Sequence, residues 1–329
     1  MNKYSVILRA YNAAGHVSKS IESIIQQSYG NWELIIVNDG STDNTGNICE
    51  EFALKDKRIK VVHQENKGCL LATQTGIKHA TGEYICLVDS DDWYEVDYLE
   101  KVNNIFCHQN VDMVVVNYKI INSASKKENN FGLVKEDFMA NTKEAMKIFL
   151  QTTNYALWNK VVAKEKIRYT EEEQKFYNTS GKSTNFGDDL YLLMPVLCGC
   201  EKIYFLSECL YNYIIDEASI SHQSVKDNWK ELLVRNRLMQ FTYDAIFNRN
   251  CMDEDIEKLI QINTVKILIT NIMTILESKK FNRKILKEMK NNVFYKEVVM
   301  KTSFGEIKKK LGKKRAIAFS IFNMIMLFG

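Results

Sequence analysis

The chain has 329 residues, 46% of them hydrophobic, so it can bury a sizeable core as one large domain with an extension or as two domains. Its formal net charge of +3 is too small to indicate nucleic-acid binding, and no stretch interleaves basic and aromatic residues as a base-stacking groove would. The composition therefore excludes a disordered chain and argues against a nucleic-acid partner.

The eight cysteines are scattered, without a pair at the spacing of a zinc finger or a redox motif. The N-terminus runs directly into a short strand pattern, without a secretory apolar region or a small-residue cleavage site. Both observations predict a protein of the reducing cytoplasm.

Strand and helix patterns alternate from the N-terminus onward. Buried strands are predicted at 5–8, 32–37, 59–63 and 84–88. Helices are predicted at 17–27, from after Thr45 to about Lys55, and at 70–79. Alternation at this spacing predicts right-handed crossovers and a largely parallel sheet covered by helices. In such a sheet, ligands bind at the carboxyl ends of the strands.

The most distinctive stretch is the acidic end of the fourth predicted strand. Asp89, Asp91 and Asp92 fall within four positions, directly after a buried apolar run. Carboxylates this close repel one another unless a cation or hydrogen-bond donors lie among them. The pattern therefore indicates a hard divalent metal, with a phosphorylated ligand completing its shell. The alternative is a loop whose aspartates cap the next helix, expected to begin near Tyr94 or Val96.

Polar residues also follow the other strands at the same predicted edge. Asp39 comes directly after the buried run 34–37, Tyr11 follows the first strand, and Asn66 lies in the loop after the third. Each can be an ordinary turn residue. Their convergence on one edge is better explained by a single ligand site, where Tyr11 can stack on a base and Asp39 can accept from a ligand's donor. No glycine-rich phosphate cradle is present, which argues against a nicotinamide enzyme and a P-loop nucleotidase.

With these motifs, the chain resembles the family 2 glycosyltransferases of the GT-A fold, from the bacterial branch that builds surface polysaccharides. The resemblance rests on Ser5-Val6-Ile7 with Tyr11-Asn12, on Val37-Asn38-Asp39-Gly40-Ser41-Thr42-Asp43, on Asn66-Lys67-Gly68 before Gly76, and on Gly82-Glu83-Tyr84-Ile85 leading to Asp89-Ser90-Asp91-Asp92-Trp93. It implies an α/β fold with a Rossmann-like, mostly parallel central sheet flanked by helices, followed by a C-terminal helical extension.

The resemblance also implies roles for the motif residues. The implied nucleotide-binding residues are Ala10, Tyr11, Asp39, Asn66 and Asp91, of which Tyr11 and Asp39 hold the base. Asp91 reaches the ribose or the metal, and Asp92 ligates a Mg²⁺ or Mn²⁺ ion that bridges the diphosphate.

The chain departs from the family pattern at two places. It has Arg9-Ala10 where a proline is usual, and Thr73-Gln74 where Arg-Asn is usual. A missing arginine removes a planar donor fork, so nucleotide affinity or preference can differ unless Lys67 or Arg9 substitutes.

A second acidic pair, Asp188 and Asp189, heads a helical pattern at 190–197, where capping is a sufficient explanation on its own. Similar enzymes carry a Glu-Asp pair here whose second member removes the proton from the acceptor hydroxyl. The resemblance therefore implies that Asp189 is the catalytic base, with Asp188 in the Glu position. His222 is a candidate metal or diphosphate ligand, although a lone histidine in a polar segment is more often a surface residue.

Between these motifs the pattern predicts strands at 113–118 and 157–162 and a helix at 142–150. The polar stretches 123–130 and 169–183 are predicted loops, and the second can fold over a substrate.

Beyond about residue 225 the pattern is purely helical, with helices predicted at 229–247, 253–276 and 282–290. The predicted domains are therefore a GT-A domain at 1–222 and a helical extension at 223–329. The extension carries six basic residues, namely Lys308, Lys309, Lys310, Lys313, Lys314 and Arg315. The apolar stretch 316–328 that follows is shorter than the ~20 residues of a spanning helix.

Basic residues beside such a helix suit an anionic lipid surface, which predicts a peripheral protein on the inner face of the cell membrane. The alternative is a helix packed on the protein itself or in a homodimer.

Together these features predict a metal-dependent inverting glycosyltransferase that uses Mn²⁺ or Mg²⁺. It would move a sugar from a nucleotide-sugar donor, expected to be a UDP-sugar, to a lipid-diphosphate-linked or surface-polysaccharide acceptor. One alternative is a catalytically silent, membrane-associated partner in a polysaccharide assembly complex, which Thr73 in place of arginine favours. Another is a nucleotidyltransferase with a similar sheet, which would release pyrophosphate instead of a nucleoside diphosphate.

Overall fold

The computed structural model describes residues 1–171, 173–174, 188–215, 228–278, 303–315, 317 and 319–320. The chain divides into two compact units, residues 1–145 with 155–222 and residues 146–154 with 223–329. Residues 146–154 thus group with the second unit, although they precede the boundary predicted after residue 222.

The first unit is built around one sheet with strand order β3-β2-β1-β4-β9-β6-β10-β5, with β7 paired to β6 and β8 to β10. The strands are β1 (Tyr4–Ala10), β2 (Trp32–Asp39), β3 (Ile59–Gln64), β4 (Tyr84–Asp89), β5 (Trp93–Tyr94), β6 (Met113–Asn122), β7 (Glu128–Phe131), β8 (Phe138–Asn141), β9 (Lys160–Ala163) and β10 (Lys202–Ile215). The helices are α1 (Val17–Ile25), α2 (Thr45–Lys55), α3 (Cys69–His79), α4 (Tyr98–His108), α5 (Thr142–Thr152), which continues into the second unit, and α7 (Asp188–Cys198), with a 3-10 turn at Lys164–Lys166.

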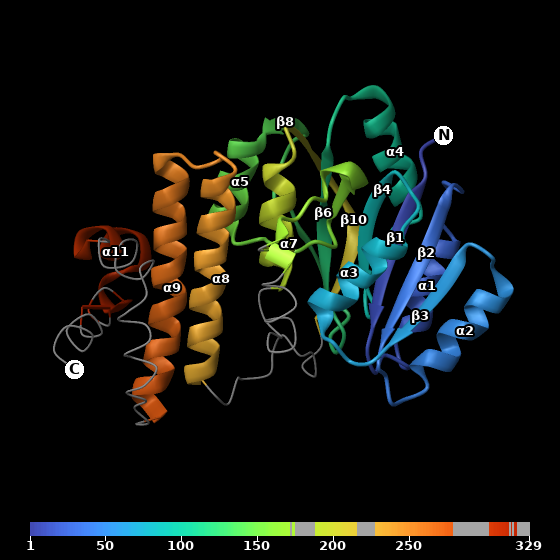
Figure 1. Cartoon of the computed structure of the whole chain (residues 1–329), viewed down its shortest axis with the longest axis horizontal. Helices are drawn as coiled ribbons and strands as arrows, with labels where there is room; N and C mark the ends of the chain where they lie inside the picture. The colour runs from blue at the N-terminus through green and yellow to red at the C-terminus, as the bar shows by residue number, and fades with distance from the viewer. Residues whose placement is uncertain are drawn as a thin grey trace. The chain divides into compact units, whose positions relative to one another are not determined.

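Strands β1 to β4 form the parallel half of this sheet, with helices α1, α2 and α3 beside them (Figure 1). Strand β9 runs antiparallel between β4 and β6, whereas β6 and β10 are parallel. All eight residues of β2 are buried, as expected of a parallel strand covered on both faces. The predicted α/β fold, a central sheet flanked by helices, is therefore confirmed.

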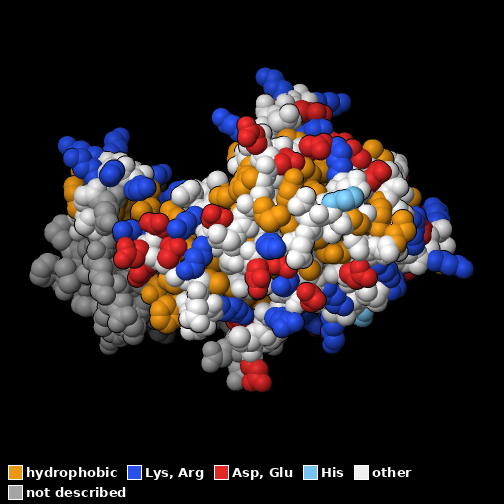
Figure 2. Space-filling view, turned by 90° about the horizontal axis from the view of Figure 1, so that it is seen from above, with side chains coloured by type: hydrophobic (Ala, Val, Ile, Leu, Met, Phe, Trp, Pro, Cys, Tyr) orange, Lys and Arg blue, Asp and Glu red, His pale blue; other side chains and the backbone are white. Residues whose placement is uncertain are grey.

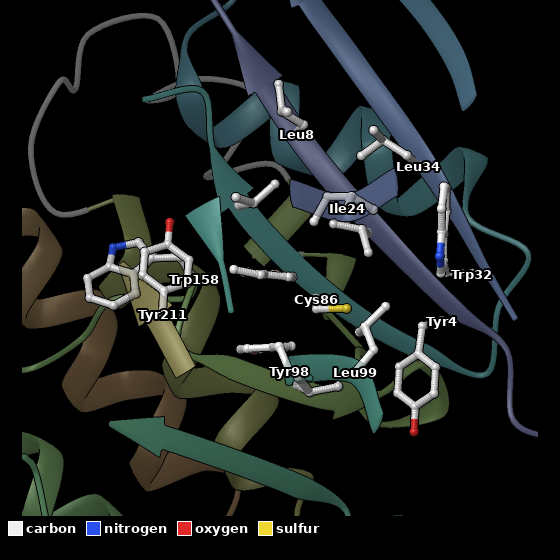
Figure 3. Close-up of a cluster of buried hydrophobic side chains, with 14 of the residues drawn as sticks. Tyr4, Leu8, Ile24, Trp32, Leu34, Cys86, Tyr98, Leu99, Trp158 and Tyr211 are labelled. Atoms are coloured by element: carbon white, nitrogen blue, oxygen red, sulfur yellow. The ribbon is translucent and has the colours of Figure 1, made fainter. Parts of the chain in front are cut away.

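The hydrophobic core follows β1, β2 and β4 and continues under β10. Figure 3 shows Leu8 and Leu34 from neighbouring strands, with Ile24 of α1 in the same cluster. At the other end of this cluster, the rings of Trp158 and Tyr211 stack with centroids 4.3 Å apart. This stacking fixes β10 against the segment that leads into β9, and both segments contribute to the site described below.

The strand register brings the polar strand ends to one edge of the sheet. Arg9 pairs with Asp89, Ala10 with Asn38, and Asp39 with Gln64. The predicted convergence of the loops after β1, β2, β3 and β4 is therefore confirmed.

The opposite edge carries a buried charge that stabilises the fold. Glu33 is 3% exposed and accepts hydrogen bonds from the Ser5 hydroxyl at 2.7 Å and the Thr81 N–H at 2.6 Å. Burial alone would raise its pKa, but these bonds and the Lys60 ammonium lower the pKa of Glu33 to about 2. Because Ser5 lies in β1 and Thr81 lies just before β4, Glu33 connects the starts of β1, β2 and β4.

Some elements differ from the predictions. Residues 128–130, predicted in a loop, form β7 together with Phe131, and their polar, exposed run lacks the apolar alternation that would indicate a strand. The helix expected near Tyr94 begins at Tyr98, because Trp93–Tyr94 pair with β10. The 14-residue strand β10 was not predicted. Its register shifts between Leu206 and Tyr211 disrupt the regular alternation that identifies a strand. Most of the stretch 169–183, predicted as a surface loop, lies outside the described residues.

The second unit contains α8 (Asn228–Asn248), α9 (Glu254–Ser278) and α11 (Phe304–Leu311), and α8 lies beside α9 (Figure 1). The end of α5 joins this unit through Lys147, which pairs with Asp253 and Asp255. The helices predicted at 229–247 and 253–276 are confirmed, and 282–290 lies outside the described residues. In the part of the chain that the structure describes, no helix combines the length and apolar character needed to cross a membrane.

Candidate active site

The acidic side chains of the site come from the end of β4 and the start of α7. Asp89 ends β4, and Asp91 and Asp92 follow in a tight turn closed by a 3.1 Å hydrogen bond from the Asp92 N–H to the Asp89 carbonyl. Asp188 begins α7, followed by Asp189. Helix α7 packs against α3, and this packing places its N-terminus near the carboxyl edge of the parallel strands.

One buried guanidinium connects the two acidic segments. Arg9, near the end of β1, hydrogen bonds to the Asp89 carboxylate, and its Nη1 donates to the Thr73 hydroxyl at 3.2 Å. The same Nη1 lies 3.8 Å from Oδ1 of Asp189. Burial would lower the pKa of Arg9, but the charges of Asp89 and Asp189 hold it well above its ordinary value. Arg9 thus reaches the position of the family arginine, which is Thr73 in this chain.

Asp189 lies among cations and one backbone donor. Burial raises the pKa of its carboxyl above the ordinary value, while Arg9, Lys160 and a hydrogen bond from the Leu157 N–H oppose that shift. Its side chain remains 28% exposed. A partly accessible carboxylate with a raised pKa is suited to accept a proton.

Lys160 is a buried lysine at the start of β9, 3% exposed. Its ammonium donates to the Asn159 side-chain oxygen at 2.8 Å and to the Ala156 carbonyl. Burial lowers the pKa of Lys160 to about 7, and the charge of Asp189 opposes the shift. Lys160 also borders an apolar cavity of about 30 Å³, shared with Thr73 and Leu192. This cavity has room for a water molecule but not for a sugar nucleotide.

Asp92 is fully buried, and protein donors bind both of its carboxylate oxygens. The Tyr211 hydroxyl donates to Oδ2 at 2.7 Å, and the Ile214 N–H donates to Oδ1 at 2.8 Å. Burial, followed by the charges of Asp89 and Asp91, raises the pKa of Asp92 well above its ordinary value. Its contacts attach the acidic turn to β10, whereas the sequence predicted a metal ligand here.

The structure allows a test of the predicted metal site. Among the described residues, no group of three or more His, Cys, Asp and Glu side chains is arranged to hold a metal ion by itself. A Mg²⁺ ion needs only one or two carboxylates when substrate phosphates and water complete its shell.

Asp91 fits that smaller requirement. It is half-buried, and burial together with the charge of Asp89 raises its pKa. A bound cation would favour the ionised carboxylate and so oppose this shift. The other predicted metal ligand, His222, lies outside the described residues.

The predicted nucleotide-binding residues lie in the loops after β1, β2 and β3. Tyr11 is 46% exposed, Asn66 is exposed, and Ala10 is buried. The Asp39 carboxylate accepts hydrogen bonds from Gln64 Nε2 at 2.6 Å and from two backbone N–H groups, of Lys67 at 2.9 Å and Gly68 at 2.8 Å. These bonds order the loop after β3 and leave one of roughly four acceptor positions for a ligand.

The loops after β2 and β3 lie close together at Gly40. Gly40 has φ +73°, and a Cβ placed there would lie 2.6 Å from the Asn66 backbone nitrogen. Any side chain at this position would push the two loops apart. The position therefore requires glycine for steric as well as conformational reasons.

Comparison with known proteins gives one family. A model described as Glycosyl transferase family 2 matches residues 5–168. The chain belongs to this family.

Glycosyltransferase GlyA of Streptococcus pneumoniae serotype 4 is 33% identical over 236 residues, which cover 71% of this chain and 33% of GlyA. The Escherichia coli UDP-Glc:alpha-D-GlcNAc-diphosphoundecaprenol beta-1,3-glucosyltransferase WfgD is 39% identical over 122 residues, covering 37% of this chain and 47% of WfgD. The match thus spans only a third of GlyA and about half of WfgD.

The fold of this family 2 chain also matches a solved structure. The crystal structure of S. aureus TarS 1–349 in complex with UDP has a TM-score of 0.68 at 18% identity, covering 98% of this chain and 88% of TarS 1–349. The match supports the GT-A fold expected from the motifs.

Three side chains of the site were not predicted as site residues from the sequence. Lys160 was visible only as a cation within an apolar strand pattern. Tyr211 gave no signal, because β10 was not predicted. Arg9 was considered only as a substitute for the family arginine, and its proximity to Asp189 depends on how α7 packs.

Proposed function

We propose that this protein is an inverting, metal-dependent glycosyltransferase that moves a sugar from a UDP-sugar to a lipid-linked or surface-polysaccharide acceptor. The observation that carries the proposal is the position of Asp189, a partly exposed carboxylate of raised pKa beside the acidic turn of a family 2 fold. An inverting transfer requires a base on the acceptor side of the anomeric carbon and charge neutralisation on the other side.

In this mechanism, Asp189 accepts the proton of the acceptor hydroxyl while the acceptor oxygen bonds to the anomeric carbon. The bond from that carbon to the diphosphate oxygen breaks, and its electron pair leaves with the nucleoside diphosphate. Tyr11 and Asp39 hold the base, with Ala10 and Asn66 beside the nucleotide. Asp91 is the proposed ligand of Mn²⁺ or Mg²⁺, which when bound would stabilise the negative charge of the departing diphosphate.

The uridine donor and the lipid-linked acceptor are supported by what similar proteins bind. The name of WfgD describes transfer from UDP-Glc onto a diphosphoundecaprenol-linked sugar, and TarS has been solved with UDP and with UDP-GlcNAc.

A thermal-shift panel tests the donor proposal. UDP, UDP-glucose, UDP-N-acetylglucosamine and GDP-mannose are each added with Mn²⁺ or with excess chelator. A ligand at 100 times its Kd stabilises the native state by ~2.7 kcal/mol, so uridine compounds with Mn²⁺ should raise the Tm by a few degrees. An unchanged Tm with every compound, with or without Mn²⁺, would contradict the proposal.

We also propose that the C-terminal basic residues attach the protein to the anionic inner face of the cell membrane. All six are exposed, and Figure 2 shows Lys and Arg side chains gathered where α11 lies. Phe304 and Ile317, at either end of this segment, are each 45% exposed. Each basic residue near an anionic surface contributes ~1 kcal/mol, and exposed apolar side chains add burial in the interface.

We therefore expect the protein to sediment with phosphatidylglycerol vesicles at low salt, and high salt to release it only in part. Replacing the six basic residues with glutamine should reduce sedimentation at low salt to about the level that high salt leaves for the wild type. The matched control replaces six exposed lysines elsewhere, namely Lys55, Lys57, Lys78, Lys126, Lys127 and Lys135, and should still sediment. Equal loss of sedimentation in both variants would mean that only the net charge of the protein matters. If the variant lacking the six basic residues changed from dimer to monomer, the segment would instead belong to a homodimer interface. Substitution is preferable to deletion because Ile307 and Phe319 are buried.

A further inference from the structure

Arg9 is placed unlike any other described arginine, because its buried guanidinium lies between the two halves of the proposed site. Its side chain is 9% exposed. It hydrogen bonds to Asp89 at the base of the acidic turn and to the Thr73 hydroxyl on α3, and Nη1 lies 3.8 Å from Asp189 at the start of α7. One planar group thus contacts three elements that are distant in the sequence.

The planar fork explains why arginine suits this position. A guanidinium presents donors in several fixed directions, whereas a lysine ammonium is a compact point charge on a flexible stem. Asp89 is joined to Asp91 by the short turn after β4. Holding Asp89 and Asp189 on one guanidinium therefore fixes the distance between the acceptor side and the leaving-group side of the site.

We propose that Arg9 is a positioning residue for sugar transfer, which holds the Asp189 carboxylate at a fixed distance from the acidic turn. This inference rests on the proposed function, in which Asp189 is the base. Arg9 is not required to touch either substrate. Its effect on the reaction passes through Asp189, so its loss should change how Asp189 titrates as well as how fast the enzyme turns over.

The charges around Asp189 determine the direction of that change. Arg9 from β1 and Lys160 from β9 favour the ionised carboxylate, as does the Leu157 N–H, whereas Asp89 from β4 disfavours it. Removing Arg9 leaves the unfavourable charge of Asp89 and one cation fewer. The pKa of Asp189 should therefore rise, and turnover, which needs the ionised base, should fall more steeply at acidic pH.

The test measures UDP release from the UDP-sugar chosen by the thermal-shift panel, with Mn²⁺ and a lipid-diphosphate-linked sugar acceptor, between pH 5.5 and 9. Arg9→Met should shift the acidic limb of the kcat profile upward by ~1 pH unit, since a cation near a carboxylate lowers its pKa by about 1–3 units. The loss should be ~10-fold or more at pH 6 and smaller at pH 9, with donor KM changed much less. Arg9→Lys should leave the limb near its wild-type position but lower kcat, because a compact ammonium on a flexible stem does not reproduce the fixed directions of the guanidinium donors.

The control is Arg58→Met, which removes an arginine that pairs with Asp56 and covers the Trp32 ring away from the site. Its kcat and pH profile should match wild type. A wild-type profile in Arg9→Met would overturn the inference. Should that variant not fold, wild-type kcat in Arg9→Lys would overturn it equally.

Failure of the inference is distinguishable from failure of the proposed function. If Asp189→Asn loses turnover while both Arg9 variants behave as wild type, only the positioning role fails. If Asp189→Asn turns over normally, the proposed base itself fails, whatever the Arg9 variants show.

Discussion

Replacing Asp189 with asparagine is expected to lower turnover by ~10²-fold or more while changing donor binding little. Asparagine keeps the shape of the side chain and an oxygen that can accept the hydrogen bond from the Leu157 N–H. It cannot accept the proton of the acceptor hydroxyl. The loss should therefore appear in kcat, measured as UDP release at saturating donor, and hardly in the donor Kd measured by calorimetry.

Asp188→Asn is the matched control for this prediction. Both residues lie at the start of α7, so both substitutions remove a negative charge from the same helix N-terminus. A similar loss of thermal stability in the two variants is the capping contribution that they share. A large loss of kcat in Asp188→Asn alone would assign the base to the other carboxylate, and near-normal kcat in both would reduce the pair to helix capping.

The second large effect concerns the acidic turn. If Asp91 holds the cation that bridges the diphosphate, UDP should bind much better with Mn²⁺ than in chelator, and Asp91→Asn should remove that gain. A loss of ~10-fold in affinity corresponds to ~1.4 kcal/mol, which calorimetry resolves easily. Equal UDP affinity with Mn²⁺ and with excess chelator would contradict the metal role.

The Asp92→Asn variant tests whether Asp92 ligates the metal, as the sequence predicted, or stabilises the turn, as its contacts in the structure indicate. The sequence predicted that Asp92 ligates the metal, so its replacement would also remove the Mn²⁺-dependent gain. In the structure, both of its oxygens accept hydrogen bonds, from Tyr211 and Ile214, and the carboxyl is fully buried. We therefore expect Asp92→Asn to lower the Tm while keeping most of the Mn²⁺-dependent UDP affinity. A folded Asp92→Asn variant with no response to Mn²⁺ would restore the sequence-based assignment.

The parallel half of the fold could be predicted because its sequence signals are local. Continuous apolar runs such as β2 identify strands buried on both faces, and alternation with helices fixes their parallel direction. Once the strands are parallel, the residues that follow them must meet at one edge. The convergence of Asp39 and Asp89 was therefore predictable without any knowledge of side-chain packing.

The contacts within the site depend on packing that no local pattern encodes. Arg9 reaches Asp189 only because α7 lies near the end of β1, and nothing near either residue indicates that arrangement. Tyr211, which lies in β10, covers Asp92 and donates a hydrogen bond to it. The register shifts of β10 disrupt the two-residue alternation that would have identified the strand. The sequence thus identified the acidic turn as a cluster of carboxylates, but no local pattern indicates that Asp92 is fully buried while Asp91 is half-buried.

The most direct test of glycosyl transfer is the identity of the phosphorus-containing product. The protein is incubated with a UDP-sugar, Mn²⁺ and a lipid-diphosphate-linked sugar acceptor, and the reaction is followed by ³¹P NMR. We predict that the UDP-sugar signals are replaced by those of UDP, and that Asp189→Asn greatly slows this change. Release of pyrophosphate would identify a nucleotidyltransferase, and an unchanged UDP-sugar spectrum across the donor panel would favour a catalytically silent partner; either result would contradict glycosyl transfer.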